Sequence, residues 1–196
     1  GTSAESDTPP AKADGTAAAP GADDAVAQVD AFIASKSIDK TKASWKTSLP
    51  KPELVQFDLG KSYYWNLKTN KGDMRFKLMP DVAPMHVTNA IYLTRLGFYD
   101  GTKLHRVIKD FMAQGGCPLG NGMGSPGYRL NLELSPKVKH DKRGVLSTAN
   151  SGPNTDGSQY FIMFKAKPFL DGSYSIYGQI DSGLDTLDKF EAIPGF

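Results

Sequence analysis

One arginine, Arg106, stands in an apolar, strand-forming run and is well suited to electrostatic work on a ligand. The run reads LHRVIKDFMAQGG, residues 104–116, so Phe111, Met112 and the amide side chain of Gln114 follow the arginine closely. A guanidinium carries a fixed charge and five N–H donors, whereas the aromatic and thioether groups offer an apolar surface. Taken alone, Arg106 could equally extend from a strand edge or pair with a nearby acid. Its neighbours favour a cation beside an apolar groove, which suits recognition or catalysis.

A second segment, residues 144–162, supplies further groups for such a groove. Its sequence, GVLSTANSGPNTDGSQYFI, runs from a turn-rich loop into another β-prone, aromatic stretch. The neutral hydrogen-bonding side chains, none of which titrates, are Gln114, Asn150 and Gln159. The apolar side chains that could line a pocket are Phe111, Met112, Phe161, Phe169 and Leu170. A pocket of this kind suits a ligand that is neutral and partly apolar.

Three other chemistries lack the residues they need. The three histidines stand 19 and 35 residues apart without a cysteine or carboxylate cluster, so we expect no metal site. The surroundings of Ser158 lack the G-x-S-x-G spacing of a hydrolase nucleophile, which argues against a Ser-His-Asp triad. The glycines of residues 115–127 match neither common nucleotide-binding pattern. The sequence therefore predicts no metal and no cofactor.

Bulk properties narrow the class of protein. A chain of 196 residues accommodates one domain with an appendage. The net charge of +2 gives no strong field, so we expect no nucleic acid partner. Cys117 is the single cysteine, which excludes an internal disulfide and a cysteine-rich zinc site. No apolar run approaches the roughly 18–20 residues that a membrane span needs.

The chain divides into three parts. Residues 1–24 are rich in small and polar residues and lack aromatic ones, which predicts a flexible low-complexity tail. Residues 25–53 form a short helix and linker, since apolar side chains recur at helical spacing up to residue 35. We expect that helix to dock on the main domain; a partner-binding helix is the alternative. Two prolines, Pro50 and Pro52, mark the boundary to the main domain at residues 54–196.

Short strands dominate the main domain. A hairpin is expected from strands at 62–69 and 74–79, joined by an Asn- and Gly-containing turn, with a helix from about residue 83 to Gly97. Further strands are expected at residues 102–108, 111–114, 130–134, 144–148, 160–164 and 175–179. A surface loop at 115–127 and a second helix at 184–192 complete the pattern. This order favours a closed β-barrel with capped ends over an alternating βα sheet.

Three sequence blocks together resemble the cyclophilins, a family of peptidyl-prolyl cis/trans isomerases. They are HRVIKDFMAQGG at 105–116, ANSGPNTDGSQYFI at 149–162 and FLDGSYSIYG at 169–178. The stretch LGFYDGTKLHR, residues 96–106, resembles the compact bacterial type, in which the helix runs directly into the catalytic strand. The resemblance covers about residues 62–192. It implies a mainly β fold, a closed eight-stranded antiparallel cyclophilin-like barrel capped by two helices, acting on proline-containing polypeptides.

The resemblance also assigns the site residues. Arg106 matches the catalytic arginine of the family. The proline pocket matches Phe111, Met112, Phe161 and Leu170. The polar lining matches Gln114 and Gln159, and the peptide-binding edge matches Ala149, Asn150 and Ser151. Phe169 and Tyr174 stand where many eukaryotic members have Trp and His. In both departures the sequence resembles bacterial members. Because the indole donor is absent, the resemblance implies weak cyclosporin binding at most.

The implied reaction explains this set of residues. Rotation about an X-Pro bond faces a barrier of about 18–20 kcal/mol because the amide is stabilised by resonance. No bond breaks, so neither a nucleophile nor an acid-base pair is required. We expect the pocket to hold the proline ring while Arg106 binds the prolyl carbonyl. We also expect Arg106 to interact favourably with the proline nitrogen as that nitrogen loses its conjugation. An acceleration of about 10⁵-fold corresponds to about 7 kcal/mol.

Several alternatives stay open at this point. The domain could be a non-catalytic proline-peptide-binding or chaperone module, and the tail with its helix could be an adaptor. We expect a monomer with an N-terminal tether, in the bacterial cell envelope or periplasm; a cytoplasmic protein is the alternative. Cyclophilins usually end in a final strand, whereas this sequence stops at Phe196. We expect either that the protein extends further or that residues 54–59 fill that edge.

Overall fold

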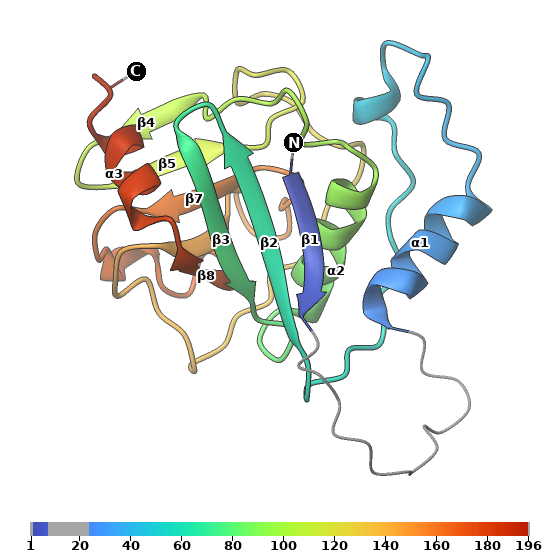
Figure 1. The fold of residues 1–196 in the computed structure, drawn as a ribbon, viewed down its shortest axis with the longest axis horizontal. Helices are drawn as coiled ribbons and strands as arrows, with labels where there is room; N and C mark the ends of the chain where they lie inside the picture. The colour runs from blue at the N-terminus through green and yellow to red at the C-terminus, as the bar shows by residue number, and fades with distance from the viewer. Residues whose placement is uncertain (1, 8–23, 196) are drawn as a thin grey trace.

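The computed structural model describes residues 2–7 and 24–195, and its centre is one antiparallel sheet (Figure 1). The strand order is β1-β2-β3-β8-β6-β7-β5-β4. The strands are β1 Thr2–Asp7, β2 Ser62–Thr69, β3 Gly72–Leu78, β4 Arg106–Ile108, β5 Met112–Gly115, β6 Val145–Thr148, β7 Tyr160–Met163 and β8 Ile176–Ser182. The helices are α1 Ala25–Ser35, α2 Pro84–Arg95 and α3 Leu184–Glu191, with 3₁₀ turns η1 Trp45–Thr47 and η2 Pro168–Leu170. The fold is thus mainly β, as expected.

The hairpin of β2 and β3 confirms the sequence-based expectation. Alternate residues of β2 are buried, among them Trp65, while the intervening ones are less so. Trp65 lies opposite Phe76 of β3, and the two rings are 5.9 Å apart. The tight connection requires Gly72, whose φ of +132° disfavours any residue with a Cβ. Local periodicity and turn chemistry therefore suffice to build this part of the sheet.

The sheet does not close into the barrel that we expected. Strands β1 and β4 end the row, and no pairing joins them within residues 2–7 and 24–195. The strand expected from residue 102 begins only at Arg106, because the N–H of Thr102 donates to the carbonyl of Tyr99 in a turn. Strand β4 is consequently three residues long and offers little edge for closure.

The strand expected at residues 130–134 is a wrong prediction. Only Leu130 forms a bridge, to Asp156. Farther along, the N–H of Leu132 donates to the Asn154 side chain and the N–H of Glu133 to the Ser175 hydroxyl. Side chains thus satisfy the backbone donors that a neighbouring strand would otherwise have taken.

The outer edge of β2 is occupied in a way that the sequence did not suggest. Residues 54–59, one candidate for that edge, form no strand. Instead β1 pairs with β2, from Thr2 opposite Leu67 to Asp7 opposite Ser62. We expected residues 1–24 to be a flexible tail. Strand pairing uses backbone groups and needs no apolar side chains, so composition did not reveal β1. The rest of that expected tail, residue 1 and residues 8–23, lies outside the described residues.

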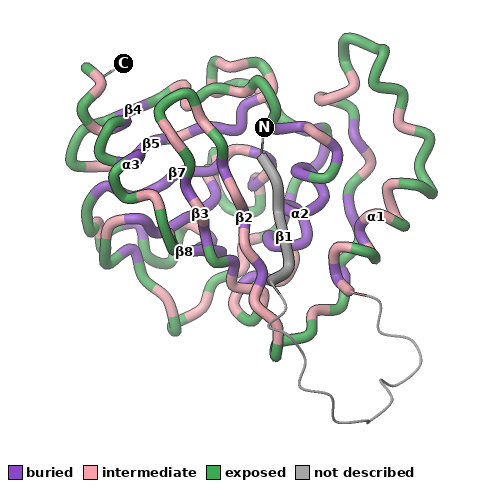
Figure 2. The backbone as a smooth tube through the Cα atoms, viewed as in Figure 1, coloured by how far each residue is buried: buried purple, intermediate pink, exposed green. Residues whose placement is uncertain are grey.

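Two apolar clusters hold the domain together. The larger one joins the β2–β3 hairpin to α2 and includes the fully buried Trp65, Phe76 and Tyr92. The smaller one joins residues of β5, β6, β7 and η2 and includes Met112 and Phe161. Figure 2 shows buried residues along these strands and α2, while most exposed residues lie in the connecting loops and on α1. The smaller cluster provides the rigid support for the site described next.

The segment before the main domain packs against α2, as Figure 1 shows for α1. The guanidinium of Arg95 donates twice to the carboxylate of Asp30, at 2.9 Å each, and the rings of Phe32 and Tyr92 meet edge to face. Docking of the predicted helix on the main domain is thereby confirmed. Residues 45–50, here called the strap, then run over α2, where the Tyr92 hydroxyl donates to the Pro50 carbonyl at 2.7 Å.

Candidate active site

Cross-strand register brings the candidate catalytic arginine and two of its expected partners onto one face of the sheet. Arg106 of β4 lies opposite Gln114 of β5, and Gln114 lies opposite Phe161 of β7. Directly opposed residues of antiparallel strands share a face, so these three side chains form a row. Met112, two residues before Gln114, lies on the same face. The row thus combines a cation, an amide and two apolar groups.

A hollow of about 190 Å³, here called the first hollow, opens over this row. Nine side chains line it: Arg106, Phe111, Met112, Gln114, Ala149, Asn150, Phe161, Leu170 and Tyr174. All nine are among the residues that the sequence predicted for the site. They come from three strands, three loops and η2, so the tertiary fold assembles what the sequence only suggested.

Arg106 is exposed at the rim of the first hollow. Within the described part of the chain no ion pair involves it, whereas Arg143 pairs with both Asp188 and Glu191. No carboxylate lines the first hollow. The donors of Arg106 are consequently available to a bound carbonyl or nitrogen lone pair.

The apolar floor of the first hollow is rigid because a buried histidine supports it from behind. Phe161 is 5% exposed, and the imidazole of His140 stacks on it at 5.9 Å with an interplanar angle of 14°. The main-chain N–H of His140 donates to the Asp171 carboxylate at 2.7 Å, and its Nδ1 lies 2.8 Å from the same oxygen. Burial lowers the pKa of His140 although Asp171 opposes this, which favours the neutral ring at neutral pH.

A second hollow, of about 260 Å³, adjoins the first and shares three of its residues, Gln114, Ala149 and Asn150. The expected residues Ser151 and Gln159 line this second hollow and not the first. Gln114 donates to the Gln159 side-chain oxygen at 2.9 Å. Gln159 in turn donates to the carbonyls of Gly122 and Gly124, which ties the glycine-rich loop to the sheet. The two adjoining hollows are together called the groove.

The twelfth expected residue, Phe169, lines neither hollow. Its side chain is 70% exposed, and its ring stacks on Phe111 at 6.0 Å. It therefore extends the apolar rim outward from the first hollow. Sequence reasoning missed other lining residues of the second hollow, among them Met123, Arg129 and Thr155. No short-range pattern distinguishes them, because two loops without periodicity, after β5 and after β6, carry them to the groove.

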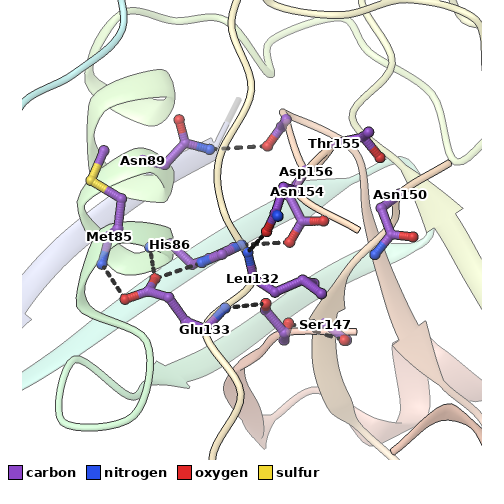
Figure 3. Close-up of polar contacts among 12 residues, drawn as sticks. Met85, His86, Asn89, Leu132, Glu133, Ser147, Asn150, Asn154, Thr155 and Asp156 are labelled. Atoms are coloured by element: carbon purple, nitrogen blue, oxygen red, sulfur yellow. Dashed lines mark hydrogen bonds and ion pairs between the residues drawn. The ribbon is translucent and has the colours of Figure 1, made fainter. Parts of the chain in front are cut away.

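The loop of residues 149–157 forms one wall of the groove, and several bonds hold it. Figure 3 shows two of them, from the Asn154 side chain to the N–H of Leu132 and from Asp156 to His86. The N–H of Ala149 donates to the Gln159 carbonyl at 3.0 Å, and that of Ser151 to the Thr155 hydroxyl at 2.9 Å. The amide of Asn150 donates to the Ser173 carbonyl at 3.0 Å. These bonds hold the wall in position.

Other features of the described residues do not suggest a competing site. In residues 2–7 and 24–195 no group of three or more His, Cys, Asp or Glu is arranged to hold a metal ion. No helix in these ranges has the length and hydropathy of a membrane span. A larger hollow, of about 670 Å³, lies between the end of β2 and residues 99–105, and none of the predicted site residues lines it.

Comparison with known proteins gives a consistent result. A family model described as cyclophilin type peptidyl-prolyl cis-trans isomerase matches residues 64–195. A peptidyl-prolyl cis-trans isomerase of Helicobacter pylori strain 26695 is 43% identical over 141 residues, covering 71% of this chain and 86% of that protein. Peptidyl-prolyl cis-trans isomerase CYP18-1 of Arabidopsis thaliana is 45% identical over 128 residues, covering 64% and 80%.

Solved structures agree with these sequence matches. A cyclophilin type peptidyl-prolyl cis-trans isomerase of Cryptosporidium parvum is similar with a TM-score of 0.64 and 39% identity, covering 66% of this chain and 83% of that one. The same protein crystallised in the presence of the dipeptide Ala-Pro gives the same score and identity. The matched region contains the whole groove, while α1 and the strap precede residue 64.

Proposed function

The chain belongs to the cyclophilin-type peptidyl-prolyl cis-trans isomerases, whose activity is the rotation of X-Pro peptide bonds, and we propose that the first hollow is where this chain performs it. The observation that carries the proposal is the position of Arg106. Its guanidinium, without an ion pair among the described residues, stands at the rim of an apolar hollow and directly opposite Gln114. A fixed cation beside a pocket without carboxylates suits a reaction that breaks no bond.

The proline ring would lie on the floor made by Met112, Phe161 and Leu170, all of which are buried. The amide resists rotation by about 18–20 kcal/mol because its nitrogen lone pair is delocalised. As the bond twists, the lone pair localises on the nitrogen, and a nearby guanidinium stabilises that charge more than it stabilises the planar amide. The stabilisation is selective for the twisted state, so it lowers the barrier.

The second hollow would hold the residues that precede proline. Ala149, Asn150 and Ser151 form its peptide-binding edge, and Gln114 and Gln159 form its polar lining. The relative from Cryptosporidium parvum was crystallised in the presence of Ala-Pro, which supports proline-containing peptides as ligands here. We propose proline-containing polypeptides as the substrates. Cyclosporin would bind weakly, because Phe169 offers no indole N–H donor. The monomeric state and the envelope location stay predictions.

Exchange NMR on a peptide that contains Ala-Pro tests the role of Arg106 directly. We expect Arg106→Ala to reduce kcat/KM about 10²- to 10³-fold, the typical loss when one aimed donor is removed. Lys109→Ala is the matched control, since it removes an exposed positive charge nearby that does not line the groove. The melting temperature of both variants should match the wild type. Equal rates for Arg106→Ala and wild type would overturn the assignment.

The same experiment separates catalysis from simple binding. If the wild-type chain binds the peptide without accelerating its cis/trans exchange, the domain is a non-catalytic proline-peptide-binding or chaperone module. Peptide titrations followed by amide chemical shifts measure binding independently of turnover. We expect Arg106→Ala to retain binding within a few-fold, because the apolar floor is unchanged.

A further inference from the structure

A buried histidine, His86 in the first turn of α2, bridges two carboxylates that come from distant segments (Figure 3). Its Nδ1 lies 2.6 Å from Oε1 of Glu133, and its Nε2 lies 2.7 Å from Oδ2 of Asp156. The side chains of His86 and Asp156 are 1% and 0% exposed. Asp156 belongs to the groove wall of residues 149–157, so this contact ties that wall to α2.

With both carboxyl groups ionised, the geometry fits a protonated imidazole. A neutral imidazole has one N–H and one bare nitrogen, so one of these short contacts would oppose two acceptors. An imidazolium donates to both carboxylates. Burial opposes the charge, yet the hydrogen bonds to Asp156 and Glu133 outweigh it, and the pKa of His86 is raised above its ordinary value. Besides the two carboxylates, the titratable group facing the ring is Tyr177 of β8, with ring centroids 6.2 Å apart.

Both carboxylates depend on this proton. Oδ1 of Asp156 is buried and has no hydrogen-bond partner among the described residues, so His86 provides the main compensation of that charge. Glu133 also accepts the backbone N–H groups of Met85 and His86, at 3.1 and 2.8 Å, which caps α2. Loss of the proton would leave the buried Asp156 carboxylate or the partly buried Glu133 carboxylate facing a bare nitrogen.

The bridge controls one end of the groove wall. The carbonyl of Asp156 accepts the N–H of Leu130 at 2.7 Å, and the carbonyl of Gly157 accepts the amide of Asn89 on α2 at 3.1 Å. The other end of the same wall carries Asn150, which lines both hollows. A shift at Asp156 therefore moves the edge against which a peptide would lie.

We propose that His86 is a positioning residue for the isomerase reaction, and that its imidazolium holds the wall of residues 149–157 where the substrate peptide binds. His86 does not touch the substrate. The inference rests on the proposed function. It predicts that His86 affects KM rather than the chemical step, because Arg106 lies on a different segment. Its stabilisation is complete below the ordinary histidine pKa of about 6.5 and is lost as the pH rises through the raised value.

Two measurements on the wild-type chain and one variant test the proposal. ¹⁵N shifts of the His86 ring at pH 7.5 should show both nitrogens protonated. Asp156→Asn keeps the shape of the wall but supplies an amide donor to Nε2, so the imidazole can become neutral. The pKa of His86 should then fall, and the ring should be mainly neutral at pH 7.5. Ring shifts typical of neutral histidine in the wild type would overturn the proposal.

The dependence of KM on pH provides a second test, because a purely structural role of His86 would not make KM depend on its protonation. We expect His86→Gln to raise KM about fivefold to tenfold while kcat stays within about twofold, and to abolish the rise of KM with alkaline pH. His105→Gln is the matched control, since it removes an imidazole outside this bridge and should leave KM unchanged. If His86→Gln folds poorly, Asp156→Asn carries the same test through its altered pH profile. An unchanged KM in both variants would refute the proposal.

The ring shifts distinguish this inference from the proposed function. They need no turnover, and the amide shifts of Asn150 and Ser151 report the wall directly. A protonated His86 in a chain without isomerase activity would refute the function and leave the bridge intact. An active enzyme whose His86 is neutral would refute the bridge and leave the function intact.

Discussion

The strap offers a test of how far the region before the family match shapes the groove. Leu49 is 5% exposed and belongs to the larger apolar cluster, and its N–H donates to the Pro126 carbonyl at 2.9 Å. The contact is close: a Cβ added to Gly127, at φ +103°, would come within 2.7 Å of the Thr47 carbonyl oxygen. Pro126 lines the second hollow. The strap thus supports the groove loop from behind.

Leu49→Ala removes the side chain that holds the strap in place. A buried Leu→Ala change typically destabilises the folded state by about 2–5 kcal/mol. Near the surface the surrounding residues can relax into the cavity, so we expect a loss of about 2–3 kcal/mol for Leu49→Ala. For a chain of this size each kcal/mol lowers the melting temperature by about 2–4 °C, so we expect a decrease of about 4–12 °C. If peptide binding must then order one loop residue again, at about 1–2 kcal/mol, KM rises about 5- to 30-fold.

The assays are thermal unfolding by circular dichroism and exchange NMR with a series of proline peptides that differ in the residue before proline. Leu54→Ala is the matched control, because Leu54 follows the strap and is 59% exposed. It should change neither the melting temperature nor KM. The reasoning fails if Leu49→Ala and Leu54→Ala have the same KM, since the strap would then have no influence on the groove. An unchanged kcat in Leu49→Ala would show that Arg106 is unaffected.

Two further predictions concern the floor and the rim of the first hollow. Because burial lowers the pKa of His140, the unfolded chain takes up a proton at a higher pH than the folded chain does. The free energy of unfolding should therefore decrease as the pH falls below about 6.5. In urea titrations, His140→Gln should reduce this dependence of the free energy of unfolding on pH. An identical dependence in the variant and the wild type would contradict its attribution to His140. Phe169→Trp adds an exposed indole donor beside Phe111 and should tighten cyclosporin binding at least tenfold by isothermal titration calorimetry. Unchanged affinity would show that the indole is not the missing group.

Much of the fold and the site follows from local sequence patterns. The alternation of buried residues around Trp65 and the turn at Gly72 determine the β2–β3 hairpin, because strand geometry repeats every two residues. The same period places Met112 and Gln114 on one face. The ordered blocks around Arg106 and Asn150 indicated which side chains would meet, and the family match confirmed the class of protein.

Other features depend on contacts that no local pattern encodes. Residues 130–134 have the composition of a strand, yet the N–H of Glu133 bonds to Ser175, 42 residues away. Composition likewise predicted a flexible tail where β1 pairs with β2, since backbone pairing is indifferent to side-chain type.

The supports of the groove belong to the same class. His140 behind Phe161, Leu49 beneath Pro126 and His86 against Asp156 each join segments that are remote in sequence. Periodicity determines which face of an element a side chain occupies. Which segments lie beside each other depends on the packing of the whole chain, and that packing alone places His86 against Asp156, 70 residues away in the wall of the groove.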